Sequence, residues 1–389
     1  MHKVILLSIL VCGLSIPAGA EEITAIKADR VDTITSGLIE NGIIVIKDGR
    51  ITAIGNDIEI PETAEIIDVS DKTIFPGLVN PSSRIGLSSP PGGGTSSKPH
   101  LRVADELYPH QDVYKHVLRR GFTTIGLVPG RGGGSGFIIF SGSMISFGSS
   151  GGGIAGQGAI IRPVGRKPEE MIVIKSGLLM INFQANDRTK NVIKSALDSA
   201  KSKTSSTDPK VQPLINALQG KIPTFINCEG PGDILHLLKL LEPYKQMKVV
   251  LNADSEQYRV ADKLAKKKIP VILTPQIDFE PFTRNRINVP KMLADAGIKI
   301  AFMPKSDSIY AHEDFLREVA ELVKAGLDKE IAKKAITINP AQMLAVDYRL
   351  GSLEVGKDAN LLVLNGDLLD IGTKIEMVMI EGKVVHKAP

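Results

Sequence analysis

The sequence predicts an α/β fold in which β-rich segments at both ends of the chain flank a longer middle region. Residues 76–340 alternate short apolar runs with amphipathic helical patterns, as is typical of a parallel sheet covered by helices. The two ends instead consist of short β-branched runs. A middle of about 265 residues suits an eight-stranded barrel, which typically takes ~250 residues, although the pattern alone also allows a doubly wound sheet.

Two β-branched runs near the start of the chain predict a hairpin. Both lie within residues 42–55 and are joined at Lys47-Asp48-Gly49-Arg50, where Asp-Gly is a strong signal for a tight turn. Similar runs return at residues 359–364 and 375–385. Two β-rich ends around a different middle indicate one small β-domain built from both termini.

The middle region contains several apolar runs that predict buried strands. They are residues 123–128, 224–227, 249–252 and 270–274. Amphipathic helical patterns lie between them at residues 232–241 and 258–265. A glycine-rich stretch at residues 130–158 lacks the Lys-Ser/Thr ending of a phosphate-binding loop, so we expect a long crossover packed over the barrel mouth.

Composition and charge exclude some classes of protein. The chain has 389 residues, of which 43% are hydrophobic and 23% charged, as in ordinary globular proteins. A net charge of +4 without basic blocks argues against a nucleic-acid partner. No segment after residue 20 is long and apolar enough for a membrane span.

Residues 1–20 have the features of a secretory signal peptide, which predicts export to the periplasm or the extracellular space. Lys3 supplies the positive start, residues 4–14 the apolar region, and Ala18-Gly19-Ala20 the cleavage site. A lipid anchor at Cys12 is disfavoured because Val11 precedes it where a small residue is expected. Cleavage would leave Cys228 as the only cysteine, so no intrachain disulfide could form.

Several motifs together resemble the amidohydrolase superfamily, particularly its exported imidazolonepropionase-like members. Pro76-Gly77-Leu78 resembles the start of the first barrel strand, and Gly121-Phe122-Thr123-Thr124 resembles the second strand. The most specific segment is residues 351–360, Gly-Ser-Leu-Glu-Val-Gly-Lys-Asp-Ala-Asn, which departs from the family pattern only at Asn360. The resemblance covers essentially the whole chain after the signal peptide.

The resemblance implies a fold and domain boundaries. We expect a (β/α)8 TIM-like barrel at residues 76–340 and a small composite β-sandwich domain formed by residues 21–75 and 341–389. It also implies an activity, the hydrolysis of non-peptide C–N bonds. In the family, four histidines, often a carboxylated lysine, and an aspartate hold Zn or another divalent metal, which lowers the pKa of bound water from ~15.7 to ~7.

The same resemblance places other residue types at the positions of the metal ligands. The first-strand histidine pair corresponds to Ser82 and Arg84, and the fourth-strand lysine to Leu179. Arg84 cannot bind a cation, so it would hold an anionic group of a ligand or form a buried ion pair with Glu229 or Asp254. We therefore expect no metal cofactor.

The later strands show the same replacement. The fifth-strand position corresponds to Asn227, with Glu229 beside it, and the sixth to Asn252 or Ala253. A carboxylate such as Glu229 could act as a general base if burial raised its pKa.

The aspartate of the last strand corresponds to Lys305 without a gap, or to Asp307 with a two-residue insertion. Only Asp307 could keep the role of that aspartate.

The leading hypothesis is an exported pseudoenzyme of the amidohydrolase family that serves as a ligand-binding or assembly subunit. It would bind a small polar or anionic ligand, and would form a homodimer or a heteromer with an active relative. The alternatives are an active amide or cyclic-amide hydrolase with a rebuilt site, whose catalytic residues would be Glu229 and Asp307, and a purely structural protein with a plugged barrel. The predicted ligand-binding residues are Ser82, Arg84, Asn227, Asn252, Asp254 and Lys305.

Overall fold

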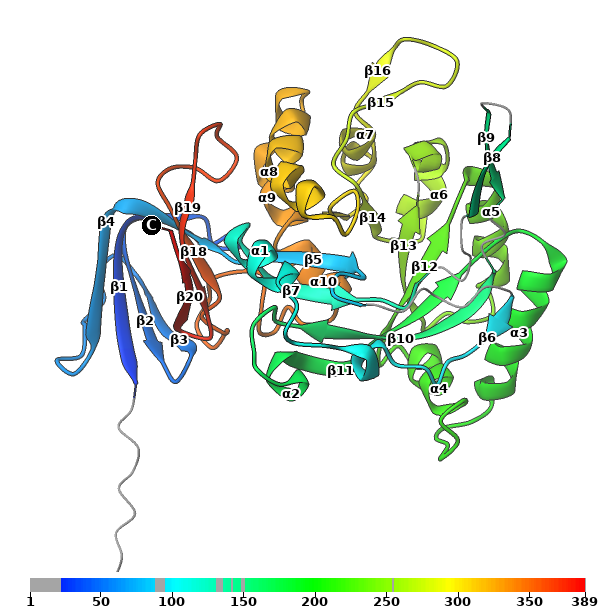
Figure 1. Cartoon of the computed structure of the whole chain (residues 1–389), viewed down its shortest axis with the longest axis horizontal. Helices are drawn as coiled ribbons and strands as arrows, with labels where there is room; N and C mark the ends of the chain where they lie inside the picture. The colour runs from blue at the N-terminus through cyan, green and yellow to red at the C-terminus, as the bar shows by residue number, and fades with distance from the viewer. Residues whose placement is uncertain are drawn as a thin grey trace, which may run out of the picture.

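The computed structural model describes residues 22–87, 95–130, 136–140, 143–147, 151–253 and 255–388. The expected signal peptide and Asp254 lie outside the described residues. The rest consists of a seven-stranded sheet at one end of the molecule and a barrel-like sheet with its helices beside it (Figure 1). No helix in the described part is long and apolar enough to cross a membrane.

The seven-stranded sheet combines both ends of the chain. Its order is β20-β19-β18-β4-β1-β2-β3, and β18 pairs antiparallel with β4 to join the C-terminal strands to the N-terminal ones. The predicted sandwich of two packed layers stays a prediction. The strands are β1 (Ile23–Asp32), β2 (Leu38–Lys47), β3 (Arg50–Gly55), β4 (Glu65–Pro76), β18 (Leu361–Leu364), β19 (Ile375–Ile380) and β20 (Lys383–Lys387).

The hairpin predicted from Asp-Gly is confirmed. β2 and β3 pair antiparallel, with Lys47 opposite Arg50. Asp48 and Gly49 have φ angles of 49° and 80°, the two positive values that a type I′ turn requires. A glycine in the second place allows the turn without the steric cost that a β-carbon would bring.

One hydrophobic cluster holds this sheet together. Ile26, Ile44 and Ile51 come from the N-terminal strands, and Leu361 and Met379 come from the C-terminal strands. The two ends of the chain therefore share one hydrophobic core, which explains why both contain short runs of apolar residues.

Eight strands form the barrel-like sheet, in the order β17-β14-β13-β12-β11-β10-β7-β5. The end strands β17 and β5 contact each other, so the barrel is nearly closed. β6 (Ser96–Ser97) pairs with β10 outside this order. The strands are β5 (Leu78–Ser83), β7 (Phe122–Leu127), β10 (Gly153–Ile161), β11 (Ile172–Asn182), β12 (Pro223–Cys228), β13 (Lys248–Ala253), β14 (Val271–Leu273) and β17 (Ile300–Phe302).

The third strand of the barrel departs from the predicted pattern. β10 pairs antiparallel with both β7 and β11, whereas β11, β12, β13, β14 and β17 are parallel. It begins at Gly153, inside the glycine-rich stretch expected to be a crossover. The described part of the β7–β10 connection is the hairpin of β8 (Gly136–Phe140) and β9 (Ser143–Phe147). An antiparallel neighbour needs no crossover helix, so the β/α alternation is interrupted here.

Side-chain caps begin several of the helices around the barrel. The side chains of Asn186, Asn288, Ser308 and Asp328 accept hydrogen bonds from the first turns of α3, α7, α8 and α9. The helices are α1 (Val113–Arg119), α2 (Pro168–Met171), α3 (Asp187–Lys201), α4 (Gln212–Leu218), α5 (Pro231–Leu240), α6 (Ala261–Lys266), α7 (Val289–Asp295), α8 (Ile309–Lys324), α9 (Lys329–Ala335) and α10 (Ile338–Met343), with 3-10 turns at Val103–Glu106 and Ser255–Val260 and short strands β15 (Asp278–Phe279) and β16 (Arg286–Ile287).

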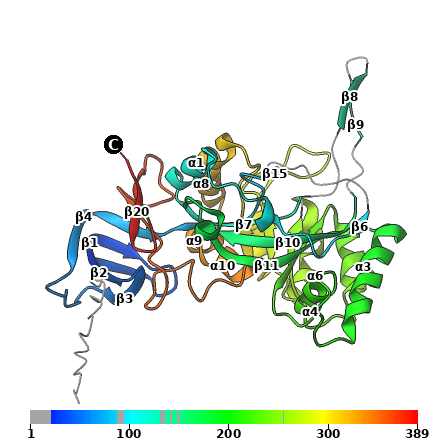
Figure 2. The same cartoon turned by 60° about the horizontal axis from the view of Figure 1, so that its bottom comes forward.

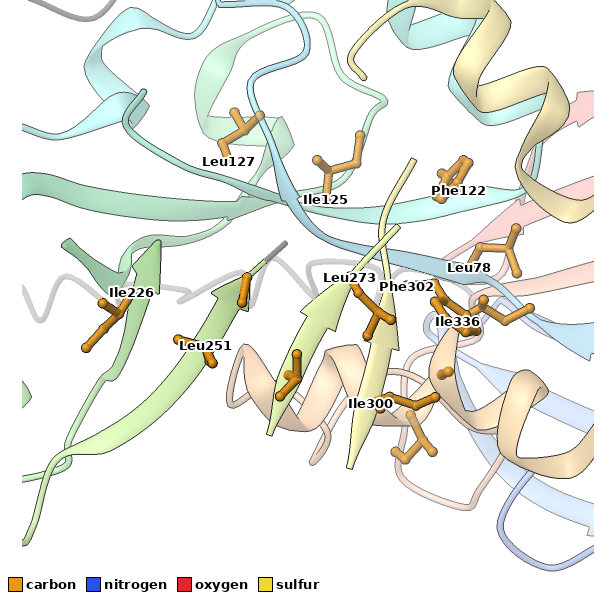
Figure 3. Close-up of a cluster of buried hydrophobic side chains, with 14 of the residues drawn as sticks. Leu78, Phe122, Ile125, Leu127, Ile226, Leu251, Leu273, Ile300, Phe302 and Ile336 are labelled. Atoms are coloured by element: carbon orange, nitrogen blue, oxygen red, sulfur yellow. The ribbon is translucent and has the colours of Figure 1, made fainter. Parts of the chain in front are cut away.

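The barrel strands bury side chains on both faces. Ile226, Leu251 and Phe302 belong to the outer layer, which packs against the helices (Figure 3). Phe225 and Val250, one residue away on the same strands, belong to a separate inner cluster that also includes side chains from residues 341–350. This alternation with a period of two decides which side chains face the barrel interior.

A cluster of ion pairs around the buried Lys333 joins the seven-stranded sheet to the barrel. Lys333 of α9 is 8% exposed, and its Nζ lies 2.7 Å from Asp32 Oδ2 at the end of β1. The same Nζ lies 3.1 Å from Glu330 Oε1 and 3.7 Å from Asp367 Oδ2, which follows β18. Burial alone would lower the pKa of Lys333, but the hydrogen bond and charge of Asp32, with those of its acidic neighbours, raise the pKa above 10.5.

We expect Lys333→Ala to lower the free energy of unfolding by roughly 3–5 kcal/mol, because it leaves Asp32 buried without its cation. Since the folded-state pKa of Lys333 is raised, its contribution is present below pH 10.5 and is lost as the pH rises through the raised value. Urea unfolding at pH 7 and at pH above 10.5 measures both effects. Lys334→Ala, an exposed neighbour on α9, is the control, and an equal loss in both variants would contradict the cluster's role.

Candidate functional site

The carboxyl ends of the parallel strands meet on one face of the barrel, which we call the mouth. Barrel enzymes of this architecture carry their active sites on this face. Ser82 lies in β5, Asn227 in β12 and Asn252 in β13, while Lys305 and Asp307 follow β17. The structure therefore brings these five predicted residues to one face of the barrel.

Three asparagines on neighbouring strands form a row at the mouth, here called the asparagine row. Asn182 is the register partner of Asn227, and Asn227 is the partner of Asn252. Their residues are 7%, 6% and 7% exposed, respectively. Because side chains alternate along a strand, the row lies on the same face as the inner-cluster residues Phe225 and Val250.

The asparagine row has hydrogen-bonding capacity left over. Asn227 Nδ2 donates to Asn182 Oδ1 at 2.6 Å, and Asn182 Nδ2 donates to the Gly130 carbonyl at 3.5 Å. Among the described residues, Asn227 Oδ1 is buried without a hydrogen-bond partner, and the Asn252 side chain makes no hydrogen bond. A buried polar atom without a partner costs ~1–3 kcal/mol, so the row is suited to a ligand that hydrogen-bonds to amides.

A second set of contacts closes the seam between the first and last barrel strands. Ser83 Oγ donates to Asp307 Oδ1 at 2.5 Å, and the backbone N–H of Arg84 donates to the same oxygen at 3.1 Å. The Ser83 hydroxyl also accepts from the backbone N–H of Ile85 at 3.1 Å. Asp307 thus bridges β5 and the segment after β17 at the mouth.

The positive side chains of the mouth point to different partners. Arg84 Nη1 donates to the Val128 carbonyl at 3.4 Å. Lys305 Nζ lies 2.7 Å from Oε1 of the buried Glu318 on α8. Of the two residues considered for the last strand, Asp307 therefore lies against the first strand, whereas Lys305 pairs with a helix.

One carboxylate near Lys305 has a perturbed pKa. Burial raises the pKa of Asp278, against the lowering effects of a hydrogen bond from Gln276 and of the charge of Lys305. Gln276 Nε2 donates to Asp278 Oδ1 at 2.8 Å. This carboxylate was not among the residues predicted from sequence.

Other predicted residues are placed less centrally. Ser82 is half-buried, and its backbone N–H donates to Asn80 Oδ1 at 3.2 Å. Glu229 is exposed, unlike Asn227 two residues before it. Asp254 lies outside the described residues. The roles assigned to Ser82 and Glu229 stay predictions.

The fourth strand corrects one sequence assignment. The resemblance predicts Leu179 at the position of the family's lysine, but Leu179 packs in the outer hydrophobic layer. The residue of β11 level with Asn227 is Asn182, three positions later. Sequence reasoning missed Asn182, although its place at the end of the apolar run Leu178-Leu179-Met180-Ile181 was a usable signal.

The metal that the resemblance implies does not fit the donors at the mouth. Among the described residues, no group of three or more His, Cys, Asp or Glu side chains could hold a metal ion. The mouth instead presents the neutral amides of the asparagine row, together with Arg84, which follows β5 and whose guanidinium donates to the Val128 carbonyl. Catalytic zinc sites use His, Cys and carboxylate ligands, and a nearby guanidinium repels a cation.

Comparison with known proteins identifies a family domain in the C-terminal part of the chain. Residues 231–385 match the Amidohydrolase family. The chain is 43% identical over 78 residues to the imidazolonepropionase of Geobacillus sp. (strain WCH70). This alignment covers 18% of the chain and 18% of that protein, so the chain spans less than a fifth of the length of this curated relative.

Solved structures extend the similarity to the whole fold. An amidohydrolase from Thermotoga maritima MSB8 superposes with a TM-score of 0.76 and 25% identity, over 94% of this chain and 100% of that one. An adenosine deaminase from Xanthomonas campestris with bound zinc gives a TM-score of 0.53 at 15% identity, over 93% and 92% of the two chains. The described structure is therefore an α/β fold with the barrel of the amidohydrolases.

We expect Ser83→Ala to lower the free energy of unfolding by ~1–3 kcal/mol, because it removes a buried hydroxyl that donates to a carboxylate. Thermal and urea unfolding measure the loss. Ser82→Ala is the matched control, since the Ser82 hydroxyl makes no hydrogen bond to the described residues. Equal stability of Ser83→Ala and Ser82→Ala would show that the contact with Asp307 does not hold the seam.

Proposed function

We propose that this chain, whose residues 231–385 form an amidohydrolase family domain on an amidohydrolase-like fold, binds a small polar ligand at the mouth without metal-dependent hydrolysis. The observation that carries the proposal is the asparagine row. Neutral amides stand at the ends of β11, β12 and β13, level with one another and nearly fully buried. Amides recognise hydrogen-bonding groups well, but they are not the His, Cys and carboxylate ligands that hold a catalytic zinc ion.

The row suggests the chemistry of the ligand. Asn227 Oδ1 would accept a hydrogen bond from an N–H or O–H of the ligand, and the Asn252 amide would both donate and accept. Arg84, at the same mouth, would favour an anionic group. A small amide that carries a carboxylate, such as an N-acyl amino acid, combines these groups.

The alternative function is hydrolysis of an amide or cyclic amide at a rebuilt site. It is favoured by one observation, the position of the Asp307 carboxylate at the mouth, where it accepts hydrogen bonds from Ser83 Oγ and the Arg84 backbone N–H. In that case Asp307 would act as a general base and Glu229 would assist it. The exposure of Glu229 and the bonding of Asp307 Oδ1 to Ser83 and Arg84 favour the binding function instead.

Export and assembly are further parts of the proposal. The features of residues 1–20 support secretion to the periplasm or the extracellular space. A ligand-binding subunit of this family could form a homodimer or pair with an active relative. We also propose that the domain formed by both ends of the chain is the two-layered sandwich expected from the resemblance. Cell fractionation would test the location of the protein, and light scattering would test the mass of its assembly.

We expect N-acetylglycine to bind wild-type protein in isothermal titration calorimetry, and Asn227→Leu to weaken binding about tenfold or more, because the variant removes a buried amide. Thr224→Val is the matched control. Thr224 lies on the same strand with a buried hydroxyl that also has no partner, but it shares the outward face of Ile226. Thr224→Val should therefore bind as wild type does.

Three outcomes would overturn the proposal. Wild-type protein that does not bind the probe would reject the ligand class, and equal binding by Asn227→Leu would reject the asparagine row as the site. Release of glycine from N-acetylglycine after addition of Zn²⁺ or Mn²⁺ would replace binding with metal-dependent hydrolysis.

A further inference from the structure

A second site lies on the face of the barrel opposite the mouth. A pocket of about 850 Å³ opens there between the amino ends of four neighbouring strands. Its walls include Pro223 at the start of β12, Lys248 at the start of β13, Pro270 just before β14 and Lys299 just before β17. The segment after α10 completes the wall with Ala345 and its neighbours.

The interior of this pocket is apolar. Leu241, Val249 and Ile269 line it and are only half-buried, so their side chains are open to a ligand. Val250 and Met343 also line it, and both belong to the inner cluster of the barrel, which closes the pocket on the inside. A volume near 850 Å³ lies within the range of small-molecule sites, ~300–1,000 Å³.

The rim of the pocket is strongly basic. Five lysines line it against two carboxylates, those of Glu242 and Asp347. None of the five lysines forms an ion pair with a described acid within 4.0 Å. Lys299 donates a hydrogen bond to Gln342 Oε1 at 2.5 Å, and the other four lysines have no such partner among the described residues. Those four are Lys245, Lys248, Lys267 and Lys268.

This arrangement attracts negatively charged groups. Like charges near one another repel, and a concave surface with apolar walls concentrates the field of its charges. Some lysines elsewhere on the described surface have an acidic partner, as Lys291 and Lys115 do, and others such as Lys334 have none. What distinguishes the rim is that five lysines line one pocket together with only two acids, Glu242 and Asp347.

We propose that this pocket is a binding site for an organic anion with an apolar body, such as a medium-chain carboxylate. The apolar walls would take the hydrocarbon part, and the lysines of the rim would hold the carboxylate. An inorganic anion would leave the walls unused, and a neutral apolar molecule would leave the charges uncompensated. The site is separate from the mouth and does not depend on the function proposed there.

The experiment uses octanoate as the probe and the full chain as the receptor. We expect octanoate to bind in isothermal titration calorimetry and to bind more weakly as salt is added, because exposed charges are screened. Lys248→Glu combined with Lys267→Glu should weaken binding about tenfold or more, since two attractive charges become repulsive. Acetate, which lacks the hydrocarbon chain, should bind much more weakly than octanoate. Ile269→Ser should weaken the binding of octanoate and leave the binding of acetate unchanged, because only octanoate contacts the apolar wall.

The matched control reverses two lysines away from the pocket, Lys334→Glu with Lys374→Glu, and should bind octanoate as wild type does. Circular dichroism and thermal unfolding of each variant establish that it is folded. Absence of octanoate binding by wild-type protein would overturn the proposal. So would equal binding of 1-octanol, or an equal loss of affinity in the control pair.

Discussion

The parallel register of β11, β12 and β13 is the constraint on which the mouth depends. Ile226 and Leu251 pack outward against the helices, so the residues next to them in sequence must face the barrel interior. A shift of one residue would send Asn227 and Asn252 into the apolar outer layer and bring Ile226 into the barrel. The hydrophobic packing thus fixes the level of the asparagine row, and no separate interaction is needed to position it.

The most specific family motif serves the scaffold rather than the mouth. In residues 351–360, Asp358 pairs with Arg349 at 2.6 Å, and Lys357 Nζ donates to Ser352 Oγ at 2.6 Å. Asn360 Oδ1 accepts from the backbone N–H of Glu381 at 2.8 Å, while its carbonyl accepts from Gly77, just before β5. These contacts join the C-terminal strands to the first barrel strand, so the motif stabilises the fold.

Sequence reasoning succeeded where short-range chemistry decides the structure. Asp48-Gly49 specifies its turn, and the apolar runs around Phe225 and Val250 specify buried strands. It failed where the structure of a segment depends on the strands that pair with it. The glycines at the start of β10 did not indicate that this segment forms an antiparallel strand of the barrel. The fourth strand was misread at Leu179 for a related reason, because only register with β12 shows that Asn182 stands at the level of the row. The ion pair between Lys333 and Asp32 connects residues 301 positions apart, so no short sequence motif could predict it.

The asparagine row is proposed to bind the ligand at the mouth through neutral amides and without a bound metal ion. Metal content of the full chain, purified without chelators and measured by inductively coupled plasma mass spectrometry, tests it most directly. The variant Asn227→His with Asn252→His, which places imidazoles on adjacent strands at one level, supplies the positive control after incubation with Zn²⁺. We expect less than about 0.1 Zn, Fe or Mn per wild-type chain and a gain of bound Zn in the variant. One stoichiometric metal ion per wild-type chain would contradict it.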